Sequence, residues 1–171
     1  MKHLFILLVV LPMFMVAQNQ EVYIKLTDAK GTPIKGNATL KGFENSIYAL
    51  TLATSGNNNS QVNFTMNITG ASADLKKAMV NNESLLSGLV TVTQLSSYKA
   101  GPDIVYTITM EKIKVQSCNE NMGCNNVMTT SITIQPIRIG WTYYQVGKSG
   151  TPTVSNKYGF DAETGGSWSK F

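Results

Sequence analysis

Apolar and polar residues alternate along several short stretches of the chain. In the clearest stretch, Val62, Phe64, Met66 and Ile68 are separated by polar residues. A period of two is typical of a strand with one face on a core and one in solvent. The same alternation recurs around residues 22–26, 48–52, 90–92, 104–110 and 132–134. The pattern therefore predicts a mainly β fold.

Two shifts in this alternation indicate irregular strands. After Met110 the apolar positions move to Ile113 and Val115, and near Pro136 they move from Ile134 to the residues that follow. Each shift predicts a bulge or a strand break. Such corners favour a sheet that curls into a small barrel.

One segment follows a helical period instead. Leu75, Ala78 and Met79 share one face of a helix, and Ser72 is a residue type that caps helix starts. We therefore expect a single short α-helix over about residues 73–81.

The start of the chain has the pattern of a secretory signal peptide. Lys2 precedes the apolar run Leu4–Val16, and the small residue Ala17 follows. The run is shorter than the roughly 20 apolar residues that a membrane-spanning helix needs. We expect residues 1–17 to be removed, which leaves one domain over residues 18–171. The mature chain is then exported, to the periplasm or the extracellular space, with no stable membrane anchor.

Composition excludes most familiar catalytic chemistry. The chain has 171 residues, a length suited to one domain, with 14% charged residues and a net charge of +4. His3 is its only histidine and Arg138 its only arginine, which disfavours histidine acid–base pairs, histidine metal clusters and arginine phosphate clamps. The carboxylates are scattered singly. We therefore predict a non-enzymatic protein without catalytic residues, metal site, cofactor or nucleic-acid partner.

The two cysteines are predicted to pair. Cys118 and Cys124 lie six positions apart in a polar Asn/Gly segment. In an oxidising compartment a disulfide between them would stabilise the fold by about 2 kcal/mol at most. Metal binding or redox exchange is the alternative, but it is disfavoured because the spacing is not CxxC and the mature chain has no histidine.

An aromatic group near the end of the chain has two interpretations. Trp141, Tyr143 and Tyr144 could form a ligand platform. Trp141 and Tyr143, however, continue the apolar positions of Ile137 and Ile139, so core packing is favoured.

Several short motifs follow one another in a fixed order. They are Val22–Leu26, Ile34-Lys35-Gly36, Lys41-Gly42 leading to Ile47, Ser72–Leu75, Tyr106–Val115 and Tyr158–Asp161. In this order the chain resembles the haemolysin-coregulated protein family, Hcp, which forms the inner tube of type VI secretion systems. The resemblance spans about residues 22–161. It implies a small β-barrel with one flanking helix that assembles as a hexameric ring and stacks into a tube.

The resemblance also implies which surfaces join the subunits. They are an edge strand at Val22–Leu26, the loop Gly31–Phe43 and the helix Asp74–Val80. The expected interface residues are Val22, Ile24, Leu26, Gly36, Lys41, Gly42, Asp74, Lys76 and Lys77. The signal peptide and the cysteine loop depart from the usual pattern of the family.

Ring assembly also has a physical motive, because a domain with many short strands must cover its strand edges. The leading hypothesis is an exported structural protein that binds copies of itself, with secretion-apparatus or cargo proteins as further partners. The alternative is a secreted β-barrel binding or adhesion module that acts through loops 55–61 and 148–156. These loops contain no Trp and no Tyr, which disfavours sugar stacking. An extracellular hydrolase is supported by export alone.

Overall fold

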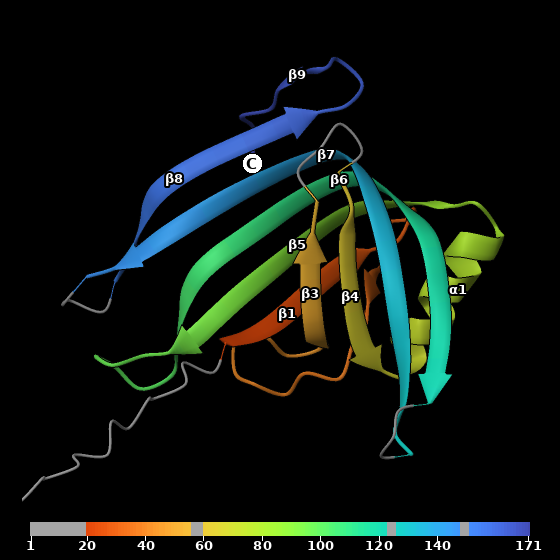
Figure 1. Cartoon of the computed structure of the whole chain (residues 1–171), viewed down its shortest axis with the longest axis horizontal. Coiled ribbons are helices and arrows are strands. Elements are labelled where there is room, and N and C mark those ends of the chain that lie inside the picture. Colours follow the sequence, from red (N-terminus) through yellow and green to blue (C-terminus); the bar gives the residue numbers. More distant parts are fainter. Residues whose placement is uncertain (1–19, 56–59, 123–125, 148–150) are drawn as a thin grey trace, which may run out of the picture.

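A computed structural model describes residues 20–55, 60–122, 126–147 and 151–171. These residues form nine strands and one helix (Figure 1). In chain order the elements are β1 (Gln20–Thr27), β2 (Pro33–Ile34), β3 (Ile47–Thr54), β4 (Val62–Asn67), α1 (Gly70–Val80), β5 (Ser84–Leu95), β6 (Pro102–Met122), β7 (Met128–Val146), β8 (Pro152–Asp161) and β9 (Gly166–Ser167).

The strands close into a barrel. Their order is β4-β3-β1-β5-β6-β7, and β4 also pairs with β7, so that the sheet returns on itself. All these pairings are antiparallel. The short β2 pairs with β1, while β8 and β9 continue the sheet beyond β7. The prediction of a mainly β barrel with one short helix is confirmed.

The long strand β7 belongs to both the barrel and its extension. Residues 129–134 pair with β4, and residues 138–146 pair with β8. The irregularity expected beside Glu111 is a single residue, Lys112, whose φ is +51°. This turn of the backbone lets Met110 and Ile113 both face the core, and β6 continues without a break.

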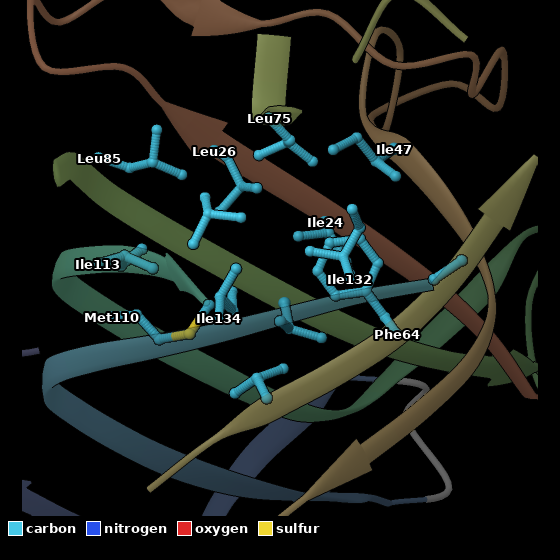
Figure 2. Close-up of a cluster of buried hydrophobic side chains, with 14 of the residues drawn as sticks. Ile24, Leu26, Ile47, Phe64, Leu75, Leu85, Met110, Ile113, Ile132 and Ile134 are labelled. Atoms are coloured by element: carbon cyan, nitrogen blue, oxygen red, sulfur yellow. The ribbon is translucent and has the colours of Figure 1, made fainter. Parts of the chain in front are cut away.

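The core fills the barrel, as Figure 2 shows. In β4 the alternation predicted from the sequence is observed, since Val62, Phe64 and Met66 are buried while their neighbours are half-buried. Ile68 lies beyond the end of this strand and is exposed. Leu75 reaches the core from α1 and is completely buried.

The helix starts three residues earlier than expected and is fixed to the barrel at that end. Thr69 precedes it, and the Thr69 N–H donates a hydrogen bond to Ser72 Oγ at 3.1 Å. Ser72 is therefore inside the first turn and is not the residue before it. Thr130 of β7 donates to the same Ser72 Oγ at 3.2 Å. This contact sets the position of α1 against the sheet.

The last ten residues, 162–171, fold back over β7 and β8, and we call them the C-terminal strap. The Trp168 N–H donates to the Gly159 carbonyl at 2.9 Å. Gly140 and Gly159 lie opposite each other in the two strands. A Cβ atom would lie 2.5 Å from Phe171 Cδ2 at the first position and 2.4 Å from Phe171 Cε1 at the second. The two glycines therefore leave the space that the Phe171 ring occupies.

Candidate subunit interface

Strand β8 has an open edge. On one side it pairs with β7 along most of its length, but on the other side the described residues pair with it only at Phe160 and Asp161. Residues 153–158 are exposed, with Val154 at 58% and Tyr158 at 59% of their full surface. Unpaired backbone groups along an exposed strand are a template for another chain.

A second open edge lies on β3. Strand β1 pairs with β3 only at Ile47–Ala49, whereas β4 pairs with it as far as Thr54. Within the described residues, Thr51–Thr54 thus has a strand partner on one side. A hollow lies beside this edge, and its lining includes Val22, Leu50, Leu52, Thr54, Val92 and Tyr106. We call the open edge and this hollow the seam; the residues that line it carry no charge.

Aromatic rings line a second hollow next to the seam. The Tyr106 and Tyr143 rings lie 4.8 Å apart, and the Trp141 and Tyr158 rings 5.8 Å apart. Thr54 and Tyr106 line both hollows, so the two hollows lie next to each other. Burial raises the pKa of Tyr106, and the neighbouring Tyr143 phenol raises it further.

The prediction that these aromatic side chains pack in the core is right for one and wrong for the other. Trp141 is buried, but Tyr143 is 47% exposed. The two share a face of β7 and both pair with β8, but Tyr143 lies farther from residues 129–134, where β7 pairs with β4 and closes the barrel. The core face of the sheet therefore becomes an open surface at Tyr143.

The only arginine joins the barrel to the start of the strap. Arg138 Nε lies 2.9 Å from Asp161 Oδ2, and its other nitrogens lie 3.2 Å from Glu111 Oε2 and 3.6 Å from Glu163 Oε2. Lys112 Nζ also pairs with Glu163 at 2.7 Å. This charge cluster links β6, β7 and β8 at the point where β9 turns back.

The charge cluster predicts acid sensitivity. The hydrogen bond from Arg138 holds the pKa of Asp161 below its usual range. A lowered pKa contributes stability above the ordinary aspartate range, and this contribution is lost as the pH falls through the folded-state value. We expect Asp161→Asn to be less stable at neutral pH and to lose less stability in acid. Melting temperatures between about pH 7 and about pH 3 measure this dependence.

Arg138→Met provides the second arm of the test, because it removes the cause of the shift. We expect the melting temperature of this variant to fall less between about pH 7 and about pH 3. If Arg138→Met retained the acid dependence of the unmodified protein, the role assigned to the arginine would be wrong.

The structure corrects the expected position of β1. This strand pairs with β5 on one side and with β2 and β3 on the other, so it is an interior strand and not an edge. Ile24 and Leu26 are buried in the barrel core. Their side chains therefore lie inside the subunit and not on its surface. Val22 is half-buried and lines the seam.

The loop between β2 and β3 is held firmly against the barrel. Gly36 donates to the Asn45 carbonyl at 2.8 Å, and Phe43 stacks on Tyr23 of β1 with ring centroids 4.3 Å apart. Gly42 has a φ of +91°, which favours glycine. Lys41 is exposed beside it. Of the interface residues expected in this loop, Lys41 presents a charged side chain to solvent.

Helix α1 presents a mixed polar face. Asp74 and Lys77 are exposed. Lys76 forms an ion pair with Glu120 of β6, and this hydrogen bond raises the pKa of Lys76. Lys76 therefore has a partner within its own subunit, whereas Asp74 and Lys77 lie along a hollow between α1 and β2.

Three predictions involve residues outside the described part of the chain. Cys118 is buried and has no disulfide partner among the described residues; its Sγ lies 3.9 Å from the Ser72 carbonyl, and burial raises the pKa of the thiol. Cys124 is not among the described residues, so its pairing with Cys118 remains a prediction. The proposed signal peptide, residues 1–17, and most of the tips of loops 55–61 and 148–156 also lie outside them.

Two further searches covered the described residues. No helix there has the length and apolar character needed to cross a membrane. No group of three or more His, Cys, Asp or Glu side chains in these segments is arranged to hold a metal ion.

The sequence did not reveal the two open edges. Alternation shows which face of a strand is buried, but a strand edge is defined by its neighbours in space. For β8 the only visible signal is a stretch with few large apolar residues, Pro152–Lys157, between turn residues and Tyr158.

A closed antiparallel barrel with an open strand at the end of its sheet defines a β-barrel subunit suited to joining other chains through its edges. The family described as "Type VI secretion system effector, Hcp" matches residues 23–143. The chain belongs to this family.

Solved structures share the fold across nearly their whole length. Hcp1 from Salmonella typhimurium superposes with a TM-score of 0.71 at 13% identity, covering 87% of this chain and 99% of that one. The secreted protein Hcp3 from Pseudomonas aeruginosa gives 0.64 at 17%, covering 81% and 98%. The Hcp1 protein of the E. coli EAEC 042 pathovar gives 0.61 at 22%, covering 79% and 97%. No curated protein matches the sequence.

Proposed function

We propose that this chain is an Hcp-like structural subunit that joins copies of itself into hexameric rings, which stack into a tube related to type VI secretion. The observation that carries the proposal is the open edge of β8, the strand that extends the sheet beyond the barrel. Membership of the Hcp family supports it.

The physical argument concerns how the open strand edges of one subunit find partners in an assembly. An exposed strand edge drives association, and an arrangement that leaves one edge free at each end continues to grow. A closed ring of identical head-to-tail contacts gives every edge a partner and stops. A ring therefore gives each open strand edge of this subunit a partner and does not grow further in its plane.

Other surfaces are available for contacts between subunits or between rings. Lys41 on the β2–β3 loop and the α1 residues Asp74 and Lys77 are exposed. We assign the helix contact to Lys77 and not to Lys76, which is paired with Glu120. Lys77→Glu is therefore the substitution that tests the helix without breaking an ion pair inside the subunit.

The proposal includes export and a structural role without catalysis. Residues 1–17 serve as a signal peptide that is removed after Ala17, and the single domain 18–171 acts outside the cytoplasm. Its main partner is itself, with secretion-apparatus or cargo proteins as further partners. The low charge density of the sequence, 14%, suits a surface that packs against copies of itself.

Size-exclusion chromatography with light scattering on residues 18–171 tests the proposed function. We expect the mass of a hexamer, maintained on dilution and at moderate salt, because backbone pairing and apolar contacts are little screened by ions. A monomer at every concentration and salt condition would contradict the proposal.

A further inference from the structure

We propose that β8 of one copy enters the seam of the next copy and pairs with the open edge of β3 at Thr51–Thr54. This inference rests on the proposed function, since it names the contact through which a ring closes. The seam is incomplete in one subunit, and a strand from a second copy completes it.

The two open edges belong to strands at different positions in the sheet, although Thr54 of β3 and Tyr158 of β8 line the same aromatic hollow. In the strand order, β8 lies beyond β7, whereas β3 lies between β4 and β1. Figure 1 shows β8 along one border, with the β3–β4 hairpin crossing in front of the diagonal strands. A contact between unlike surfaces is head-to-tail, and head-to-tail contacts generate rings when the rotation closes. Pairing of β8 with another β8 would instead give a two-fold dimer.

The chemistry of the two edges also fits. The residues that line the seam and the aromatic hollow carry no charge, and residues 153–156 of β8 are uncharged. Lys157 is the exception, but its Nζ donates to the Phe171 carbonyl and lies 4.2 Å from the centre of the Phe171 ring. The strap therefore holds this charge in place, and the uncharged residues 153–156 are the part of β8 that matches the uncharged seam.

Each edge also carries an exposed apolar side chain. Leu50 beside the seam is 48% exposed, and Val154 on β8 is 58% exposed. Strand addition provides backbone hydrogen bonds, and pockets beside the edge accept side chains of the added strand. The aromatic hollow, which shares Thr54 and Tyr106 with the seam, is such a pocket.

A charge in the seam tests the contact. In a filled seam, the ammonium group of Leu50→Lys would lose water without gaining a partner, which is costly. We expect the concentration at which half the subunits assemble to rise at least about tenfold. Leu89→Lys is the matched control, because Leu89 is 37% exposed on β5 and lines neither hollow. Its assembly should match that of the unmodified protein.

Cross-linking keeps the test decisive if Leu50→Lys fails to fold. Leu50→Cys and Val154→Cys are combined in a chain with Cys118→Ala and Cys124→Ser, and the rings are oxidised. We expect a ladder of covalent oligomers on denaturing gels. The control pair of Leu89→Cys with Val154→Cys should remain monomeric on the gel.

The outcomes separate the two claims. Rings that form normally with Leu50→Lys and give no cross-link would overturn the β8–β3 contact, while the proposed function would stand. An unmodified protein that never leaves the monomeric state would overturn both.

Discussion

Replacing Gly36 with alanine is expected to lower the free energy of unfolding by about 3 kcal/mol. A Cβ atom at this position would lie 2.3 Å from the Ile47 nitrogen and 2.3 Å from the Ser46 carbonyl oxygen. These are backbone atoms at the start of β3, so no side-chain rotation can relieve the overlap. The β2–β3 loop or β3 itself must move. Chemical denaturation of the mature chain measures the effect.

Alanine substitutions at two other glycines serve as comparisons for this prediction. At Gly70, the first residue of α1, a Cβ atom meets nothing within 4 Å, so Gly70→Ala should change stability by less than about 1 kcal/mol. At Gly88 the nearest atoms belong to the side chains of Ile113 and Leu26, each 2.8 Å away. Gly88→Ala should therefore have an intermediate cost. If Gly36→Ala were as stable as Gly70→Ala, the close packing of the loop would be refuted.

This result would also change the role of Gly36, which the resemblance placed at the subunit interface. Its close approach to β3 and its hydrogen bond to Asn45 shape the loop that carries Lys41. An effect of Gly36→Ala on ring formation would then act through the loop and not through a direct contact. Ring yield and fold stability should fall together in this variant.

Replacing Trp168 with alanine is expected to release the C-terminal strap. Trp168 is 8% exposed, and its ring packs on Phe171 with the ring centroids 4.9 Å apart. The variant keeps the backbone N–H of residue 168 that donates to Gly159 but loses this packing. Truncation of a buried Trp costs about 3 kcal/mol. Because the strap covers one face of β8, we expect the β8 amides to exchange faster with solvent and ring assembly to weaken. Denaturation and hydrogen exchange measure the two effects.

A change from the other side of the same contact should have the same result. At Gly159→Ala the new Cβ would lie 2.2 Å from the Trp168 carbonyl oxygen and 2.4 Å from Phe171. Ser169→Ala, at an exposed position of the strap, is the matched control and should change neither measurement. Unchanged β8 exchange in both Trp168→Ala and Gly159→Ala would show that the strap does not support β8.

The sequence predicted the elements that depend on the pattern of apolar and polar residues within a short segment. Alternation identified the buried face of β4, and helical spacing placed Leu75 and Ala78 on the buried face of α1. The order of the short motifs led to the correct family and hence to a closed barrel. The first two signals are present within a few neighbouring residues, whereas the third is the order of several short motifs along the chain.

The features that the sequence did not predict depend on distant partners. β1 looked like an edge strand, but β3 and β5, far apart in the chain, cover it on both sides. Tyr143 has the same alternation as Trp141 and is nevertheless exposed, because it lies farther from the β7 residues 129–134 that pair with β4 and close the barrel. The contact of Gly36 with Ile47 is likewise visible only in the folded chain.

The candidate interface shows the same division. The expected charged positions Lys41, Asp74 and Lys77 are exposed, since isolated charges remain in solvent. The expected apolar positions Ile24 and Leu26 are core residues, because an apolar strand residue suits a core as well as an interface. The open edges of β3 and β8 replace them as the strand contacts in our proposal.

Electron microscopy of the negatively stained mature protein tests the central claim most directly. If strand edges left open in one subunit are completed by its neighbours, the images will show closed hexameric annuli, end-on or stacked. Isolated particles of subunit size at every concentration would contradict the account.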